Sequence, residues 1–417
     1  MSEIGLVLGR GGPATHRRSP APPVRQDRTA PRRAPASPDP TDRFYAAVRL
    51  VVRFWLWFCF KPVDIRHPER VPADGPVLLC INHPNNLIDS LVVAAALRRK
   101  VHFLAAAAMF RNPLVARFLR ACGAIPVYRK EDDPDKMGPN AKAFAACFQA
   151  LEGGRLIAMY PEGTTHAEAR VQRIKSGAAR IALGHEAARP GELSLIPVGL
   201  TFEARKSFLG RVLVSFGEPI PVAPYLEAHR QDPCKAVDAL TRAIQRAMEA
   251  ELNRALLAEH RVKDEGVQAR RRRPLRRERV LHSWVAIVGF PFFVYGAVVN
   301  GLPYLIPCWL ARRLAKKETD YATVRFLASV VAFPLCWTLE TCVVGWLTGA
   351  AGAAVFALSL PLTGLVAYRY LVGAGHLRSR LRFGVLAFTR EQAARCLVGE
   401  REAIIAELER VQADYLR

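Results

Sequence analysis

Residues 75 to about 220 alternate short apolar runs with segments whose apolar positions recur at helical spacing. Helical patterns lie at 84–99, 139–151 and 174–188. The runs that predict strands are GPVLLCI, VHFLAAA, GAIPV, RLIAMY, LSLIPVGLTF and RVLVSFG. This alternation is typical of an α/β domain with a mostly parallel sheet, in which functional side chains lie at strand ends.

The second half of the chain contains long stretches without charge. Residues 283–310 and 341–368 carry no Asp, Glu, Lys or Arg, and residues 326–339 are apolar up to Glu340. An apolar stretch of about 18 or more residues is long enough to cross a bilayer as a helix. These runs therefore predict a helical membrane domain, and the alternative is a set of buried core helices in a soluble domain.

Basic residues flank residues 283–310 on both sides. Because Lys and Arg accumulate on the cytoplasmic side of a membrane, both ends of this run should face the cytoplasm. We therefore expect a re-entrant hairpin that turns near Asn300, followed by two spans at about 326–347 and 350–369. The arrangement predicts an integral membrane protein with its α/β domain on the cytoplasmic face.

The formal net charge of +23 suits an anionic membrane surface, nucleic acid or a phosphate-bearing substrate. Residues 1–42 are rich in Pro, Arg, Ala and Ser and predict a disordered basic tail. The run AAVRLVVRFWLWFCF, from Ala46, predicts a helix in a membrane interface or, equally, a helix packed on the core. The rest of the chain is predicted to consist of five segments: an interfacial helix with its lead-in at 43–74, an α/β domain at 75–260, a basic linker at 261–282, membrane segments at 283–370 and an amphipathic C-terminal helix at 371–417.

A histidine and an aspartate follow the first apolar run in the sequence INHPNNLIDS, residues 81–90. The run predicts a buried strand that ends near His83, and the helical pattern after it places Asp89 one to two turns into a helix. A carboxylate there can hold the proton-bearing nitrogen of the imidazole and stabilise the imidazolium, which would make His83 a general base. The alternative is a helix-capping aspartate beside a histidine with a structural role.

No enzyme nucleophile accompanies this pair. The sequence has no GxSxG elbow, and Cys80 lies on a strand that we expect to be buried. The nine cysteines form no CxxC pair, so neither a disulfide framework nor a metal site is predicted, and no cofactor is expected. The base would therefore activate a hydroxyl group of the substrate itself.

Three more predicted strands end in residues suited to binding a substrate, with solvated turns as the alternative. GAIPVYRKED places Arg129 and Lys130 beyond a short strand, where they suit a phosphate. In RLIAMYPEGTTH, Gly163 permits close backbone approach, and Glu162 can hydrogen-bond a hydroxyl or orient a cation. SLIPVGLTF supplies a fourth strand, with Pro197 near its end.

These four stretches, in this order, resemble the PlsC-type superfamily of glycerol-phosphate and lysophosphatidate acyltransferases. The resemblance implies that His83 is the base that lets an acceptor hydroxyl attack the thioester of acyl-CoA or acyl-carrier protein, without an acyl-enzyme, while Asp89 orients it. It also implies that Gly123 and Arg129 form the block that binds the acceptor phosphate. The residues expected to bind substrate are Asn82, Gly123, Arg129, Lys130, Glu162, Gly163, Thr164, Lys175 and Pro197.

Two departures from the usual motifs point to one branch of that superfamily. The acid follows the histidine by one residue more than usual, giving H-x5-D, and the Arg that commonly follows PEGT is replaced by Thr165 and His166. This pattern resembles the branch that includes fungal glycerol-3-phosphate and dihydroxyacetone-phosphate acyltransferases. The resemblance implies apolar membrane segments after the acyltransferase domain, and phosphate binding by Arg129, Lys175 or other residues.

The predicted activity is transfer of a fatty acyl group to glycerol 3-phosphate or 1-acylglycerol 3-phosphate, with membrane lipid as a partner and no nucleic acid. Dihydroxyacetone phosphate or another lysophospholipid is the alternative acceptor. Two alternatives belong to other classes: a membrane-tethered basic binding protein, and a transporter suggested by Glu340 within an apolar run. The acyl-chain length, the donor and the oligomeric state are left open.

Overall fold

The computed structural model describes residues 40–59, 63–128, 140–203, 210–272 and 289–389, with scattered positions between 399 and 410. The tail predicted at 1–42 lies almost entirely outside these residues.

A seven-stranded sheet forms the centre of the α/β domain, in the order β1-β7-β6-β2-β5-β3-β4. All neighbouring strands are parallel except β6 and β7, so β1 and β7 run opposite to the other five. The mostly parallel sheet predicted from the sequence is confirmed, although β1 was not predicted. The strands are β1 (Val63–Arg66), β2 (Val77–Ile81), β3 (Val101–Ala106), β4 (Ile125–Val127), β5 (Leu156–Met159), β6 (Ser194–Phe202) and β7 (Val212–Phe216).

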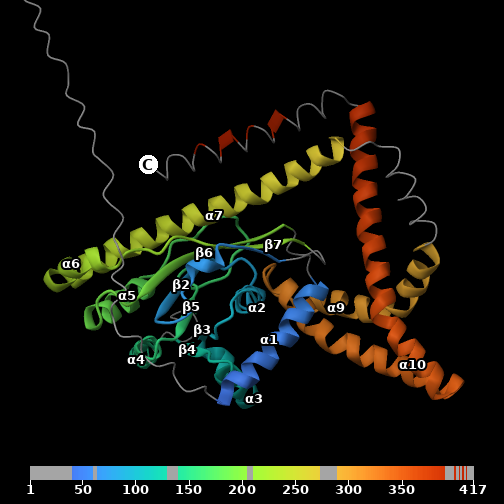
Figure 1. Cartoon of the computed structure of the whole chain (residues 1–417), viewed down its shortest axis with the longest axis horizontal. Helices are drawn as coiled ribbons and strands as arrows, with labels where there is room; N and C mark the ends of the chain where they lie inside the picture. Colours follow the sequence, from blue (N-terminus) through green and yellow to red (C-terminus); the bar gives the residue numbers. More distant parts are fainter. Residues whose placement is uncertain are drawn as a thin grey trace, which may run out of the picture. The chain divides into compact units, whose positions relative to one another are not determined.

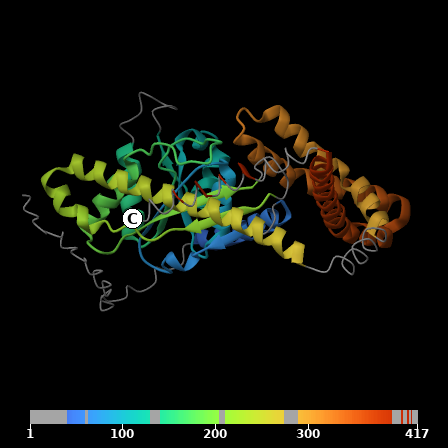
Figure 2. The same ribbon diagram turned by 90° about the horizontal axis from the view of Figure 1, so that it is seen from above.

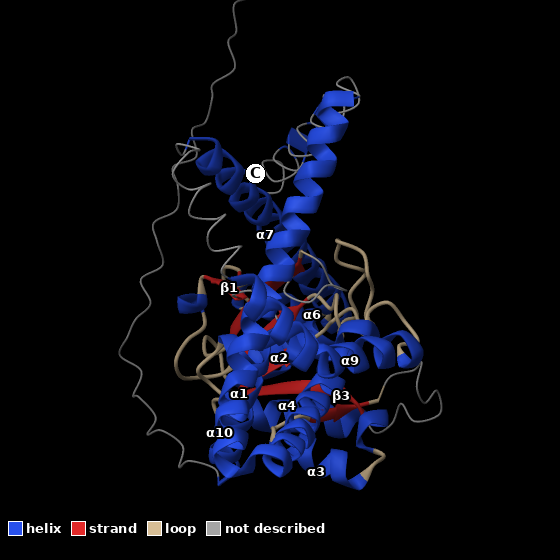
Figure 3. Cartoon of the chain, turned by 90° about the vertical axis from the view of Figure 1, so that its right-hand side faces the viewer, coloured by secondary structure: helices blue, strands red, loops and turns tan. Residues whose placement is uncertain are grey.

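Helices cover both faces of this sheet, and the strands lie between them (Figures 1 and 3). Leu79 and Ile81 of β2 pack with α1, α2 and the beginning of α10, whereas Leu78 and Cys80 pack with α4, α5 and α7. Burial on both faces explains why the strands are continuous apolar runs and not alternating ones. The helices around the sheet are α1 (Pro40–Cys59), α2 (Leu87–Ala96), α3 (Pro113–Ala121), α4 (Asn140–Glu152), α5 (Gly177–Ala188), α6 (Leu226–Gln231) and α7 (Pro233–Arg272), with short 3₁₀ turns at Pro68–Arg70, Ala107–Phe110 and Ala223–Tyr225.

Helix α7 extends past residue 260, where the sequence analysis placed the end of the α/β domain. It continues to Arg272, so the first part of the stretch predicted as a basic linker is helical. Leu240, Ile244, Met248 and Leu252 recur every four residues and are buried against the sheet. This apolar stripe anchors α7 on the sheet, and the helix runs on beyond it.

Helix α1 has two apolar sides with different surroundings. Trp55 and Leu56 are buried in the core, and the Arg49 guanidinium donates hydrogen bonds to the carbonyl groups at the end of α2. On the other side Leu50 and Trp57 are 71% and 58% exposed. The helix thus packs on the α/β domain and also presents large apolar side chains outward, as an interfacial helix would.

The C-terminal helices change direction at two places (Figure 2). Helix Gly289–Val299 and α9 (Gly301–Leu314) are bent by 54° at Asn300, which is less than the full reversal of the predicted hairpin. Helix α10 (Asp320–Thr389) is broken at Gly349, where φ is +82°. A Cβ on Gly345 would lie 3.1 Å from that of Ala353, so the two arms of α10 fold against each other.

One helix in the described part of the chain is long and apolar enough to cross a membrane. It is the stretch Asp320–Ala367, whose most apolar window has a mean hydropathy of 1.8. Only 22% of that window is buried inside the protein. The bent pair at Asn300 adds a second candidate if it forms one broken span. Large apolar side chains such as Trp346 and Leu358 are 86% and 72% exposed on these helices.

Helix Gly289–Val299 approaches the second arm of α10 very closely at Gly296. A Cβ there would lie 2.8 Å from the carbonyl carbon of Thr363. Nearby, Asn300 accepts a 3.0 Å hydrogen bond from the Trp337 indole, which links this bend to the first arm of α10.

Replacing Gly296 with leucine should lower the free energy of unfolding by about 1–3 kcal/mol, because the backbone of α10 has no room to retreat. Thermal unfolding of the purified full-length chain in detergent measures this loss. Gly289→Leu is the matched control, since a Cβ at Gly289 of the same helix meets nothing within 4 Å. Equal unfolding midpoints for the two variants would contradict the prediction.

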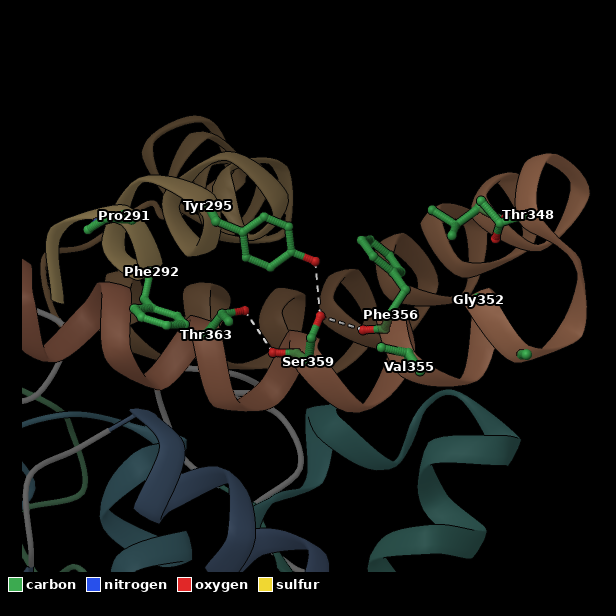
Figure 4. A pocket seen from close by; sticks show the side chains of 11 residues that line it. Pro291, Phe292, Tyr295, Thr348, Gly352, Val355, Phe356, Ser359 and Thr363 are labelled. Carbon is green, nitrogen blue, oxygen red and sulfur yellow. Dashed lines mark hydrogen bonds between the residues drawn. The ribbon is translucent and has the colours of Figure 1, made fainter. Parts of the chain in front are cut away.

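A largely apolar groove of about 760 Å³ lies among the C-terminal helices (Figure 4). The Tyr295 hydroxyl and Ser359 Oγ lie 3.0 Å apart within it. The groove contains none of the residues predicted to bind substrate. Its lining residues are Pro291, Phe292, Tyr295, Val344, Thr348, Ala351, Gly352, Val355, Phe356, Ser359 and Thr363.

Candidate active site

Strand β2 is held at its carboxyl end by Asn82. The Asn82 side chain donates to the Leu200 carbonyl at 3.0 Å and accepts from the Leu200 amide at 2.7 Å, so it continues the ladder between β2 and β6. Both amide atoms of this buried residue are therefore used by the protein. The structure gives Asn82 an anchoring contact, whereas the sequence predicted that it binds substrate.

His83 and Asp89 meet as the spacing predicted. The His83 Nδ1 atom lies 2.8 Å from Asp89 Oδ2, and the same oxygen accepts the Asn85 amide at 2.8 Å. Helix α2 begins at Leu87, so Asp89 lies in its first turn. The Asp89 side chain is fully buried, whereas that of His83 is 15% exposed. Because a carboxylate only accepts hydrogen bonds, Nδ1 carries a proton, and in the neutral form of the ring the lone pair is on Nε2.

Tyr160 and Ser90 support His83 from one side, and the sequence analysis missed both. The rings of His83 and Tyr160 are stacked with centroids 3.7 Å apart, and the Tyr160 hydroxyl lies 2.8 Å from Ser90 Oγ. Burial, reinforced by the negative charge of Asp89, raises the pKa of Tyr160 well above its ordinary value. Tyr160 is therefore a neutral stacking partner. Its place directly after β5, just before the PEGTTH stretch, was the available signal.

Glu162 connects the two loops that follow β2 and β5. One carboxylate oxygen accepts the His83 backbone amide at 3.3 Å, and the other accepts the Gln172 amide at 3.1 Å and contacts His166 Nε2. The side chain is fully buried. We expected Glu162 to bind a hydroxyl or a cation of the substrate, but in the structure its partners are protein groups that fix the position of His83.

Replacing Glu162 with glutamine should change stability in a pH-dependent way. Burial raises the pKa of the Glu162 carboxyl above its ordinary value of 4.5, and this outweighs the opposing effects of His166 and the backbone amides. The folded state therefore holds this proton more tightly than the unfolded state, and stability is lost as pH rises through the folded pKa. The unfolding midpoint of Glu162→Gln relative to wild type should therefore rise as the pH is raised above 4.5.

Glu168→Gln is the matched control for this pH series. The exposed Glu168 has its pKa lowered by its hydrogen bond to Arg170, so the difference from wild type should change with the opposite sign. If the difference in unfolding midpoint between Glu162→Gln and wild type does not change with pH, the pKa of the buried Glu162 carboxyl is not raised and the prediction is wrong.

Gly163 and Lys175 lie together beside this loop. Gly163 has φ +75°, and a Cβ there would lie 2.8 Å from the Lys175 ammonium nitrogen. The Lys175 amide donates to the Pro161 carbonyl at 2.8 Å, and its side chain is exposed. Thr164 is also exposed. The loop thus presents an ammonium group close to a glycine backbone, an arrangement that suits an anionic group.

The other predicted binding residues are more dispersed. Arg129 and Lys130 lie outside the described residues. Gly123 has φ +85°, and a Cβ on this residue would lie 2.8 Å from Cε1 of the His102 ring. Both facts are structural reasons for a glycine at this position. Pro197 is buried in β6, paired with Cys80 of β2. The structure therefore does not bring Pro197 to an open surface.

Cys80 has no access to substrate. Its side chain is fully buried on β2, and burial raises the pKa of the thiol to about 12. This agrees with the expectation that Cys80 itself is not a nucleophile. Within the described ranges, no group of three or more His, Cys, Asp and Glu side chains comes together as metal ligands do.

The fold and this site define an α/β domain with a histidine–carboxylate pair at the carboxyl end of a central parallel strand. Residues 62–201 match the family described as Acyltransferase. The chain therefore contains an acyltransferase domain of the PlsC type, and the resemblance seen in the motifs is confirmed.

Named relatives agree with this assignment. The chain is 33% identical over 107 residues to glycerol-3-phosphate O-acyltransferase 2 of Saccharomyces cerevisiae, covering 25% of this chain and 14% of that protein. It is 25% identical over 187 residues to 1-acyl-sn-glycerol-3-phosphate acyltransferase of Streptococcus pneumoniae, covering 43% and 64%. The chain thus spans less than two thirds of the length of either relative. The crystal structure of the 1-acyl-sn-glycerophosphate acyltransferase PlsC from Thermotoga maritima is 18% identical, with a TM-score of 0.36, and the match covers 49% of this chain and 79% of that one.

Proposed function

We propose that the whole chain is a membrane-bound O-acyltransferase of glycerolipid synthesis. It moves a fatty acyl group from acyl-CoA or acyl-carrier protein to a hydroxyl of glycerol 3-phosphate or 1-acylglycerol 3-phosphate. The observation that carries the proposal is the 2.8 Å contact between His83 Nδ1 and the buried Asp89 carboxylate, within an acyltransferase domain. This contact holds Nε2 ready to accept a proton.

The proposed reaction is direct transfer between donor and acceptor. His83 Nε2 takes the proton of the acceptor hydroxyl as its oxygen attacks the thioester carbonyl carbon, and Asp89 balances the imidazolium charge. The tetrahedral intermediate then collapses, the C–S bond breaks, and the departing thiolate receives the proton from the imidazolium. A new ester and a free thiol result, and no bond to the enzyme is formed.

Cationic groups on the loops at the carboxyl end of the sheet suit the acceptor phosphate. Lys175, over Gly163, is the described candidate, and we assign Arg129 and Lys130 to the same task from the sequence. Thr165 directly follows PEGT, at a position where related enzymes commonly carry an Arg. In this chain Lys175, which lies beside Gly163, would supply the positive charge instead.

A membrane location suits a reaction whose acyl chain and product are apolar, because it avoids moving lipid through water. The exposed apolar residues of α1 and of the C-terminal helices support contact with lipid, and the basic flanks support a cytoplasmic α/β domain. Dihydroxyacetone phosphate or another lysophospholipid is the alternative acceptor. Two alternatives belong to other classes. The Arg-rich stretches would suit a membrane-tethered binding protein. A transport role is motivated by the buried Glu340 Oε2, which lacks a hydrogen-bond partner among the described residues.

The experiment is acyl transfer from labelled palmitoyl-CoA by membranes that carry the full chain. Glycerol 3-phosphate, dihydroxyacetone phosphate and 1-acylglycerol 3-phosphate are supplied in parallel, with His83→Ala and Cys80→Ala variants. Activity on one acceptor that is lost in His83→Ala and kept in Cys80→Ala supports direct transfer and identifies the acceptor. If a folded, inserted chain acylates none of them from acyl-CoA or from acyl-carrier protein, the binding and transport alternatives replace this proposal.

A further inference from the structure

We propose that Asp320, the first residue of α10, is a positioning residue of the active site and acts through Asn86. The inference rests on the proposed function and adds a residue far outside the stretch that matches the acyltransferase family. Asp320 lies in the C-terminal helical part of the chain, whereas the family match ends at residue 201. The C-terminal helices would therefore serve the catalytic geometry as well as membrane attachment.

The backbone of Asn86 adopts a conformation that normally requires glycine. Its φ and ψ are +51° and −129°, which are the values of the first central residue of a type II′ turn. A non-glycine residue is strained in this conformation, which persists only if the surroundings hold it. Asn86 also precedes α2, and its carbonyl accepts the Asp89 amide at 3.2 Å. The backbone conformation of Asn86 therefore controls the position of Asp89 relative to His83.

The side chain of Asn86 is held from the C-terminal part of the chain. Its Nδ2 donates to Asp320 Oδ1 at 2.9 Å, while Asp320 Oδ2 accepts the Lys317 amide at 3.3 Å. The carboxylate is thus fixed by its own loop and directed at Asn86. Because the acceptor is ionised, this hydrogen bond is stronger than one between neutral groups.

A second contact beside the first shows that the loop before α10 is seated on both active-site loops. Thr319 is only 4% exposed, and its hydroxyl lies 3.3 Å from that of Thr165 in the PEGTTH stretch. The neighbouring His166 amide donates to the His83 carbonyl at 3.3 Å. Two consecutive residues, Thr319 and Asp320, therefore contact the loop after β5 and the loop after β2.

Apolar packing fixes the beginning of α10 so that Asp320 cannot move away. Ala322 and Phe326, in the first two turns of α10, belong to the same core cluster as Val92 of α2. Removing the Asp320 carboxylate would leave this packing in place and release the Asn86 side chain and the Lys317 amide. We then expect Asn86 to relax toward an ordinary backbone conformation, and Asp89 to shift relative to His83.

The test is a double-mutant cycle on the purified full-length chain, with the acceptor on which wild type is active. Asp320→Ala should reduce kcat about 10-fold with little change in the KM for acyl-CoA, because misplacement of a catalytic group slows the chemical step. In the Asn86→Gly background the same substitution should cost less than about 2-fold, because glycine adopts this conformation without help. Asn112→Ala, which removes the cap of α3, is the matched control and should leave kcat within about 2-fold.

Hydrogen exchange gives a readout that does not depend on activity. The peptide that contains residues 84–90 should exchange faster in Asp320→Ala than in wild type, while the β5 peptide should not change. Full kcat and unchanged exchange in Asp320→Ala would overturn the inference, and so would an equal loss in the Asn86→Gly background. An inactive wild-type chain would count against the proposed function instead, and the exchange result would still decide the role of Asp320.

Discussion

Replacing His83 with alanine should reduce kcat by about 10²–10⁴-fold, the range that general-base catalysis contributes. The loss follows from the removal of Nε2, the proposed acceptor of the hydroxyl proton. Because the neighbouring Asp89 and Glu162 side chains are held mainly by backbone amides and His166, their positions should survive. The KM values for donor and acceptor should therefore change much less than kcat.

Two measurements make the His83 result decisive. The first is the unfolding midpoint of His83→Ala, which should stay close to that of wild type. The second is the activity of His229→Ala, on α6, which removes an imidazole away from the strand ends that carry the site. Full activity in His83→Ala would mean that His83 is a structural residue and that the assigned mechanism is wrong.

Asp89→Asn should reduce kcat by about 10²-fold or more, although it removes no group that touches the substrate. The neutral amide cannot balance an imidazolium, and bulk solvent cannot screen that charge at Asp89, whose side chain is fully buried. The amide nitrogen can also donate to His83 Nδ1, which would place the imidazole proton on Nε2 and block proton transfer.

The double variant His83→Ala/Asp89→Asn separates this role from a general loss of structure. If Asp89 acts through His83, the double variant should be no slower than His83→Ala alone, because the two residues work as a unit. A double variant that is slower by the product of the two single effects would show that Asp89 acts independently of His83.

The sequence predicted the central strands well because β2, β5, β6 and β7 are buried on both faces. Continuous apolar runs such as the one that became β2 have few alternative structures when polar turns bound them. It missed β1, whose four residues include two charged side chains. It also missed the extent of α7, because the helix continues through a basic stretch after its apolar stripe ends.

Part of the site could not be predicted, because its contacts join residues far apart in the chain. Tyr160 stacks on His83 only because β2 and β5 are neighbours in the sheet. For Glu162 the sequence indicated a polar group at a strand end but not its partners. Its carboxylate oxygens contact His83, Gln172 and His166, so Glu162 holds the loop that carries His83.

By itself the sequence determined that His83 and Asp89 come together at the end of a buried strand, since apolar periodicity and the H-x5-D spacing are local properties of the chain. Only the tertiary structure decided which side chains hold those residues in place. Asp320 is 234 positions from Asn86, and their hydrogen bond exists because α10 packs on the same core as α2. Packing of distant segments follows from the summed burial of many side chains, and no short stretch of sequence records it.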